Sequence, residues 1–309
     1  MQMLRVSVII PFSKPDVIEV TLEKLVHQTY PAELTEIIIV GPGSNSLANR
    51  WPIKAIDTHA IYYPGEARNI GAAEAAGEYF LFIDDDCEPA PDWIEQNIHE
   101  LEQPKVAAVG GQIAGKSKEF FAQCVDFSSF GFSQMNRRME IPVCSASLAV
   151  KRQAYEAAKG FSEVLRSGED IDFCYRLIKM GYKTVYQPAV KVLHNHRRKN
   201  FSTLLRYSYF YGKVKGLYVK LLHANMSKRN KILTLFYHPL IYLMMIIPVS
   251  FGITGTIIRF NVREYPRVLL YAPFILLSKV AYHLGIWQWI LLHQATSDRK
   301  NVRGILADH

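Results

Sequence analysis

Short apolar runs alternate with helix-like stretches over residues 1–200 of this 309-residue chain. Residues 6–10, 36–40 and 79–83 consist mainly of β-branched, aliphatic and aromatic side chains, which is typical of strands buried on both faces of a sheet. Residues 16–28 carry apolar side chains at helical spacing. Strands that alternate with helices predict parallel pairing with right-handed crossovers. We therefore expect an α/β fold, with a Rossmann-like, mostly parallel sheet and flanking helices.

The same patterns predict further elements. Residues 64–77 indicate a loop that passes into an alanine-rich helix, and residues 168–180 indicate a helix that begins at Gly-Glu-Asp and ends before a glycine. The aromatic-rich segment 116–139 predicts no regular element. Strands are expected at residues 53–62, 106–113, 143–151 and 184–193, and a helix at 89–102.

The last third of the chain differs in composition. Residues 201–231 mix aromatic with basic side chains and predict a basic amphipathic helix at an interface. Residues 232–309 predict an apolar helical hairpin and a cytoplasmic tail, because residues 240–258 carry no charge over a length close to that of a bilayer. The second apolar segment contains Lys279, which costs about 2.5–3.5 kcal/mol at mid-membrane. We expect this segment either to pack on the first through Lys279 or to lie in the interface. Two core helices of a soluble domain would give a similar pattern.

Charge and cysteine content bear on the location of the protein. The net charge is +8, and residues 197–231 hold ten Lys or Arg and no Asp or Glu. A basic block beside apolar segments favours an anionic membrane surface over nucleic acid as the partner. The four cysteines show no C-x-x-C spacing, which fits reduced thiols in the cytosol. No secretory signal is evident at the start. These features predict a membrane-associated protein with its first 200 residues in the cytoplasm.

Carboxylates gather at the expected ends of the elements. Asp84, Asp85 and Asp86 follow a buried strand, and Glu169 and Asp170 open a later helix. Because the carboxyl ends of strands form the ligand crevice of an open α/β sheet, these groups can converge on one site. Adjacent carboxylates repel one another unless a cation compensates them, and oxygen ligands favour Mn²⁺ or Mg²⁺ over zinc. For the triplet alone, a solvated acidic turn is the alternative.

The last predicted strand adds candidate ligands. His194 and His196 lie at its end, followed by Arg197. A histidine there could complete a metal site or contact phosphate, and the arginine could add charge-assisted contacts. A cation held by Asp86 could stabilise a pyrophosphate leaving group, while Asp170 could take the proton of an attacking hydroxyl.

These motifs together resemble those of a family 2 inverting glycosyltransferase with the GT-A fold. The resemblance covers residues 1–200. The segments that carry it are Val-Ser-Val-Ile-Ile-Pro at 6–11, Gly-Glu-Ala-Arg-Asn-Ile-Gly at 65–71, the triplet Asp84-Asp85-Asp86, and Gly-Glu-Asp-Ile-Asp-Phe at 168–173.

The resemblance implies a role for each matching residue. Asp170 is expected to be the catalytic base, with Glu169 beside it. A metal site is expected at Asp84, Asp86 and His194, with Mn²⁺ or Mg²⁺ as the cofactor. The residues expected at the donor nucleotide and its diphosphate are Pro11, Phe12, Arg68, Asn69, Asp84 and Asp85. A helix N-cap is the alternative role for Asp170, and a surface salt bridge is the alternative for Arg68.

The implied activity is metal-dependent hexosyl transfer from a nucleotide-sugar donor to a lipid-linked glycan or polysaccharide acceptor. The acceptor follows from the expected membrane location and not from a motif. One departure concerns the base of the nucleotide: family members commonly carry an Asp after the second strand, where this chain has Gly41-Pro42-Gly43, so the base stays open. A nucleotidyltransferase on a similar fold would need a glycine-rich loop after the first strand, and residues 11–15 contain no glycine. A non-catalytic membrane adaptor is the other alternative.

Overall fold

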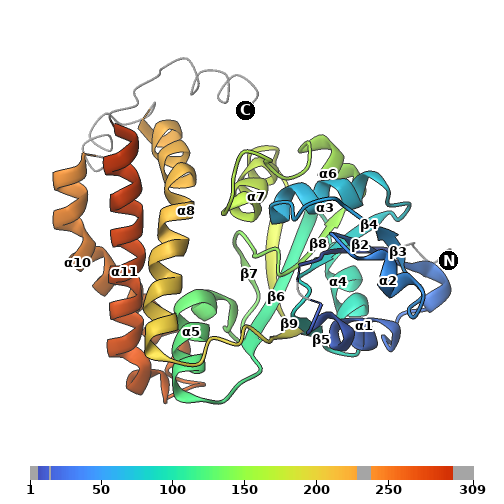
Figure 1. The fold of residues 1–309 in the computed structure, drawn as a ribbon, viewed down its shortest axis with the longest axis horizontal. Helices are drawn as coiled ribbons and strands as arrows, with labels where there is room; N and C mark the ends of the chain where they lie inside the picture. Colours follow the sequence, from blue (N-terminus) through green and yellow to red (C-terminus); the bar gives the residue numbers. More distant parts are fainter. Residues whose placement is uncertain (1–5, 14, 228–237, 295–309) are drawn as a thin grey trace.

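The computed structural model describes residues 6–13, 15–227 and 238–294 (Figure 1). The expected tail after residue 294 and the basic residues at 228–231 lie outside this part of the chain. The strands are β1 (Val6–Pro11), β2 (Thr35–Val40), β3 (Lys54–Ile56), β4 (Tyr79–Ile83), β5 (Cys87–Pro89), β6 (Val106–Gly115), β7 (Met139–Glu140), β8 (Ser147–Lys151) and β9 (Lys183–His194). The helices are α1 (Ile18–Val26), α2 (Asn45–Ala48), α3 (Pro64–Ala73), α4 (Trp93–Leu101), α5 (Phe120–Phe130), α6 (Arg152–Ala157), α7 (Glu169–Lys179), α8 (Phe201–Ser227), α10 (Pro239–Asn261) and α11 (Val268–Gln294), with short 3₁₀ turns η1 (Ala32–Leu34) and η2 (Gly131–Ser133).

One mixed sheet forms the centre of the first 200 residues. Its strand order is β3-β2-β1-β4-β8-β6-β9-β5, with β7 on β9. The first four strands in this order pair in parallel, with Val8 opposite both Ile37 and Leu81. β8 runs antiparallel to both β4 and β6. β6 and β9 again pair in parallel, whereas β5 and β7 run antiparallel to β9. The sheet is therefore mixed, and the expected parallel pairing holds for β3-β2-β1-β4 and for β6 with β9.

Helices cover both faces of this sheet (Figure 1). On one face, apolar residues of α1 and α4 join the core that contains Val8, Leu81 and Trp93. On the other face, α3, α6 and α7 pack over Ile9 and Phe82. The apolar runs of β1 and β4 are buried throughout, as continuous apolar strands require. The loops after β1 and β9 are hydrogen-bonded to the loop after β4, from Ser13 to Asp85 and from Asn195 to Asp86.

Several expected boundaries are corrected. The helix expected at 89–102 begins only at Trp93, because Cys87–Pro89 pairs with β9 as a short strand. The strand expected at 53–62 is limited to β3, and the strand expected at 143–151 begins at Ser147. The unassigned segment 116–139 contains α5 and part of β7. Its aromatic side chains are used for packing on α11.

The helices α8, α10 and α11 form a second body against α5 (Figure 1). A Cβ on Gly285 of α11 would lie 2.0 Å from the carbonyl oxygen of Tyr209, and a Cβ on Gly212 of α8 would lie 1.9 Å from that of Tyr282. Only glycine lets two helix backbones approach so closely. The long helix α8 is therefore fixed along one side by α11.

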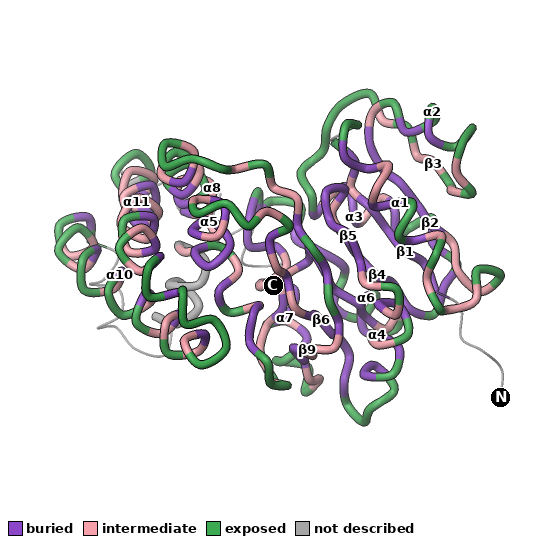
Figure 2. The backbone as a smooth tube through the Cα atoms, turned by 90° about the horizontal axis from the view of Figure 1, so that it is seen from below, coloured by how far each residue is buried: buried purple, intermediate pink, exposed green. Residues whose placement is uncertain are grey.

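Two of these helices, α10 and α11, are long and apolar enough to cross a membrane, with mean hydropathies of 2.0 and 1.4. Their outer sides expose apolar residues (Figure 2), among them Leu240, Met244 and Leu270, which are 65%, 77% and 64% exposed. Core helices of a soluble domain would have this surface covered. These helices fit association with a membrane.

The sequence suggested that α11 packs on α10 through Lys279. This lysine has a different partner. Its ammonium instead donates a hydrogen bond to the carbonyl oxygen of Ser128 in α5. The neighbouring Ser278 hydroxyl bonds with those of Ser128 and Ser208. The polar groups of this apolar helix therefore face the rest of the protein. The division of the chain at residues 200 and 231 stays a prediction.

Candidate active site

The three aspartates after β4 point to three different partners. Asp85 is 3% exposed, and its carboxylate accepts hydrogen bonds from the backbone amide of Ser13 at 2.7 Å and from its hydroxyl at 3.3 Å. The carbonyl oxygen of Asp85 accepts a bond from the Thr21 hydroxyl at 2.9 Å. Asp85 thus fixes the loop after β1.

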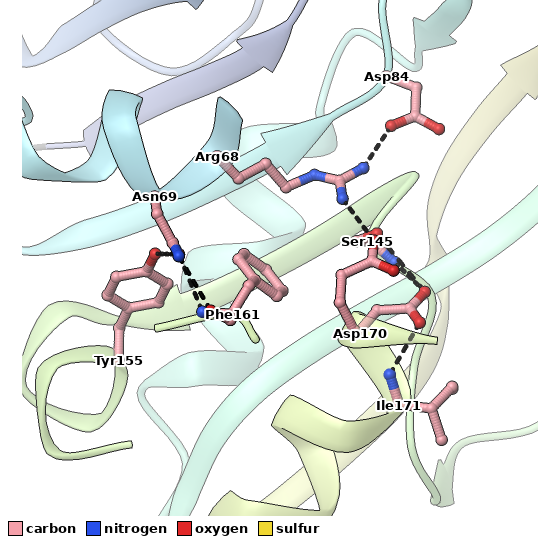
Figure 3. A network of polar contacts seen from close by, with 9 residues as sticks. Arg68, Asn69, Asp84, Ser145, Tyr155, Phe161, Asp170 and Ile171 are labelled. Carbon is pink, nitrogen blue, oxygen red and sulfur yellow. Dashed lines mark hydrogen bonds and ion pairs between the residues drawn. The ribbon is translucent and has the colours of Figure 1, made fainter. Parts of the chain in front are cut away.

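Arg68 joins the motifs that the sequence placed far apart (Figure 3). Its guanidinium donates to Asp84 Oδ1 at 2.6 Å and to Glu169 Oε1 at 2.9 Å, and it lies over the ring of Phe161. The side chain is 2% exposed, so this contact is no surface salt bridge. Burial lowers the pKa of Arg68, but the carboxylates of Asp84 and Glu169 raise it above its usual value overall, so the guanidinium stays charged.

Asn69, next to Arg68, faces away from the aspartates. Its amide oxygen accepts bonds from the Tyr155 hydroxyl at 2.6 Å and the Phe161 amide at 2.9 Å, and its amide nitrogen donates to the Phe161 carbonyl at 2.9 Å (Figure 3). This asparagine therefore holds the segment before α7 against α3. The structure does not bring it to the aspartates.

Two acidic residues open α7, behind Gly168 at a φ of 86°. Asp170 Oδ2 accepts a bond from the backbone amide of Ser145 at 3.1 Å, and Oδ1 accepts one from Ile171 at 2.8 Å. The N-cap position belongs to Gly168, so Asp170 is not the helix cap. Burial and then the charge of Asp170 raise the pKa of Glu169, Arg68 lowers it, and the net result is a pKa of about 7.

A candidate metal site lies where β4 and β9 end. Asp86 Oδ1 is 3.2 Å from His194 Nε2, and both side chains are buried. The Cys87 thiol is close by, because its residue pairs with His194 across β5 and β9, and ligand atoms of the three residues lie within 4.8 Å of one another. His194 Nδ1 is buried without a hydrogen-bond partner among the described residues. A carboxylate and an imidazole side by side fit Mn²⁺. Of the three expected ligands, Asp84 points to Arg68 instead.

His196 is occupied by other contacts. Its Nδ1 accepts a hydrogen bond from the backbone amide of Arg198 at 3.1 Å. Its Nε2 therefore carries the proton of the neutral ring and donates to Asp126 Oδ1 at 2.9 Å. Both ring nitrogens thus support the segment after β9, which leaves His194 as the histidine able to take a metal.

A pocket of about 290 Å³ opens beside the aspartates, and Pro11, Phe12, Asp84 and Asp85 line it as expected. Its other wall includes Tyr62 and Tyr63, which the sequence interpretation missed. The sequence signal that could have indicated them is a pair of adjacent aromatic residues just before the motif at 65–71. Their side chains are 40% and 41% exposed.

The position after β2, where the resemblance predicts an Asp, has no room for a side chain in this protein. A Cβ on Gly41 would lie 2.1 Å from the carbonyl oxygen of Phe12, so no side chain fits where β2 ends. The nearby carboxylate of Asp57 instead accepts a bond from the Gly43 amide at 2.9 Å. Recognition of a base in this pocket cannot use a carboxylate at position 41.

Comparisons with known proteins identify a similar family and a similar fold. Residues 7–156 match the protein family described as Glycosyl transferase family 2. The Pre-mycofactocin glycosyltransferase of Mycobacterium tuberculosis (strain ATCC 25618 / H37Rv) is 28% identical over 165 residues, which cover 51% of this chain and 35% of that protein. The chain therefore matches only about a third of the length of that relative.

Two further similarities extend over more of the chain. A Methanococcus voltae protein named dolichyl N-acetyl-alpha-D-glucosaminyl phosphate 3-beta-D-2,3-diacetamido-2,3-dideoxy-beta-D-glucuronosyltransferase is 27% identical over 279 residues, which cover 82% of this chain and 83% of that protein. The mannosyltransferase PcManGT from Pyrobaculum calidifontis, solved with GDP-Man and Mn²⁺, has a TM-score of 0.61 at 19% identity, covering 92% of this chain and 86% of that one. The latter similarity establishes the fold.

Proposed function

We propose that the chain, which matches glycosyl transferase family 2 over residues 7–156, transfers a sugar from a nucleotide-sugar donor to a hydroxyl of a lipid-linked glycan or polysaccharide acceptor. The transfer would invert the configuration at the anomeric carbon. One observation carries the proposal: the Arg68 guanidinium bonds to both Asp84 and Glu169. It brings the end of β4 and the start of α7 together, as a leaving diphosphate and an attacking hydroxyl require.

The pocket beside Asp84 suits the donor nucleotide. Tyr62 and Tyr63 line this pocket together with Pro11 and Phe12, and both tyrosines are partly exposed. Base–aromatic stacking is favourable for any base. Arg166 lies 5.0 Å above the Tyr63 ring, which holds that ring in place. We therefore expect stacking to supply most of the affinity for the base.

Asp86 and His194 would hold a divalent cation, Mn²⁺ or Mg²⁺. When bound, such an ion supplies positive charge to the diphosphate as its bond to the sugar breaks. The protein itself keeps this end of the site dry, because Asp86 and His194 are 4% and 6% exposed. Arg68 adds a fixed positive charge on the side of Asp84.

Asp170 would act as the base. Its carboxylate is partly exposed, and the amides of Ser145 and Ile171 hold both oxygens in place while leaving lone pairs for a proton. The acceptor oxygen attacks the anomeric carbon, its proton passes to Asp170, and the bonding electron pair leaves with the diphosphate. Attack from the face opposite the diphosphate inverts the configuration.

A lipid-linked acceptor and a membrane location are supported by independent observations. Both α10 and α11 expose apolar side chains, and the name of the Methanococcus relative describes a dolichyl phosphate-linked substrate. The basic residues before α10 favour an anionic, cytoplasmic membrane surface.

The test is release of nucleoside diphosphate from a panel of nucleotide sugars with Mn²⁺. We expect release from at least one donor, and Asp170→Asn to slow it by about 10²- to 10⁴-fold. Asp172→Asn is the matched control, because Asp172 sits in the same helical turn but bonds to Arg176 at 2.9 Å. No release from any donor, or equal rates for Asp170→Asn and the wild type, would exclude the proposed mechanism.

A further inference from the structure

A stripe of aromatic and cationic side chains runs along α8. Tyr207, Tyr211, Lys215 and Tyr218 follow one another at intervals of four, four and three residues, which places them on one side of a helix. The glycines that touch α11 lie on a different side of the same helix. Together with Arg198, which precedes α8, these residues are called the α8 stripe.

The members of the α8 stripe contact one another in order. Arg198 lies 3.8 Å above the centre of the Tyr207 ring. The Tyr207 and Tyr211 rings are stacked with their centres 5.3 Å apart. Lys215 Nζ lies 5.7 Å from the ring centres of both Tyr211 and Tyr218. The stripe is thus a continuous surface with one cation before its first ring and another between its last two.

This surface faces the candidate base, since α8 lies between α11 and α7 (Figure 1). A Cβ on Gly168 would lie 3.1 Å from Lys215 Cε and 2.9 Å from Tyr218 Cγ, and Gly168 is two residues before Asp170. At the other end, Arg198 follows the candidate metal ligand His194 by four residues. The stripe therefore runs along the site on the side away from the nucleotide pocket.

Neither cation forms a close ion pair in the part of the chain that the structure describes, although the charges of Asp170 and Glu169 act on Lys215. Among the described residues, no carboxylate lies within 4.0 Å of Arg198 or Lys215 in an ion pair, and Arg198 Nε is buried without a hydrogen-bond partner. Burial lowers the pKa of Lys215, but the Tyr282 phenol and Asp170 raise it above its usual value overall, so the ammonium stays charged. Unpaired cations beside a reaction site favour an anionic ligand.

We infer that the α8 stripe binds the phosphate of the acceptor, with Lys215, the cation nearer Asp170, as its cationic contact, and with the tyrosine rings and Arg198 along the group attached to it. The inference rests on the proposed sugar transfer, because it assigns the substrate class of the same site. The donor diphosphate belongs at Asp86 and His194, which leaves Lys215 for a second phosphate. A phosphate carried by a lipid suits a helix whose other side packs on apolar α11.

Binding of decyl phosphate to the full chain in a neutral detergent tests the inference by isothermal titration, with inorganic phosphate and decyl glucoside as comparison ligands. Lys215→Gln is expected to weaken decyl phosphate binding by about tenfold to a hundredfold, the effect of one charge-assisted hydrogen bond. Arg198→Gln, at the other end of the stripe, should weaken it less. Lys215→Arg should retain binding. Lys213→Gln is the matched control, because it removes the same charge from another side of α8. Decyl glucoside should bind equally to all variants.

Each outcome decides one point. Tighter binding of decyl phosphate than of inorganic phosphate, weakened by Lys215→Gln, supports a lipid-borne phosphate. Equal affinity of the two phosphates, weakened by Lys215→Gln, supports a soluble phosphate-bearing acceptor. Equal binding by the wild type and Lys215→Gln, or an equal loss in Lys213→Gln, overturns the site. No nucleotide sugar is present, so a negative result here leaves the donor panel and the proposed transfer untouched.

Discussion

Replacing Arg68 by Met tests whether one buried cation holds the site together. The substitution keeps the length of the side chain but removes the charge between Asp84 and Glu169, whose side chains are 31% and 8% exposed. Removing one partner of a buried ion pair costs about 3–5 kcal/mol, because the remaining charge is left without compensation. In a domain of this size that loss lowers the melting temperature by on the order of 10 °C.

The loss should depend on pH in a defined direction. Burial and the charge of Asp170 raise the pKa of Glu169 from 4.5 to about 7, against the opposing effect of Arg68. The folded protein therefore holds this proton between pH 4.5 and 7, where the unfolded chain has lost it. The contribution of Glu169 to the free energy of unfolding is complete below pH 4.5 and is lost as the pH rises through 7. The free energy of unfolding differs by on the order of 3 kcal/mol between these limits. Without Arg68 the charged form of Glu169 becomes still less favourable. The variant should therefore lose more stability at pH 8 than at pH 5.5.

Thermal unfolding of the full chain in detergent, followed by tryptophan fluorescence, measures both effects. Arg152→Met is the matched control: Arg152 also lies 5.7 Å above a phenylalanine ring, but its ion pair with Glu156 is exposed, and exposed pairs contribute at most about 1 kcal/mol. A shift in Arg68→Met no larger than in Arg152→Met, or one that is the same at both pH values, would refute the reasoning.

Three further changes test other parts of the structure. His194→Ala should weaken Mn²⁺ binding in a calorimetric titration, and unchanged affinity would remove this histidine from the metal site. Tyr62→Ala should weaken binding of the nucleoside diphosphate by about tenfold, since base stacking contributes roughly 1–3 kcal/mol; equal affinity would contradict stacking. Gly285→Val should lower the melting temperature sharply, because its Cβ would lie 2.0 Å from the Tyr209 carbonyl oxygen. Gly252→Val is the control, since a Cβ there would have nothing within 4 Å. Equal melting temperatures of the two variants would contradict a tight crossing of α8 and α11.

The buried strands could be predicted because their chemistry is local. A strand covered on both faces needs an uninterrupted apolar run, and β1, β2 and β4 have one. The short strand β5 could not be predicted, because Cys87–Pro89 is a strand only through its pairing with β9. The cysteine beside His194 was missed for the same reason.

Within the site, residue types could be predicted but partners could not. The sequence placed Asp84 and Glu169 at one crevice, yet nothing local indicates that Arg68 reaches both, across separations of 16 and 101 residues. The mixture of tyrosines and basic residues in α8 was visible as composition. Which side of that helix faces α7 depends on the glycines that fix its other side on α11.

The polar contacts of α11 have a consequence for how the protein can be handled. Lys279 and Ser278 are satisfied by Ser128 and Ser208, outside their own helix. Separating the hairpin from α5 and α8 would leave the ammonium of Lys279 and several hydroxyls without hydrogen-bond partners in apolar surroundings, at a cost of several kcal/mol. The hairpin of α10 and α11 is thus an integral part of the folded protein, and removing it would destabilise the rest. A chain truncated after residue 227 would bare the apolar strip around Val125 that α11 covers, and it should aggregate instead of yielding a soluble enzyme.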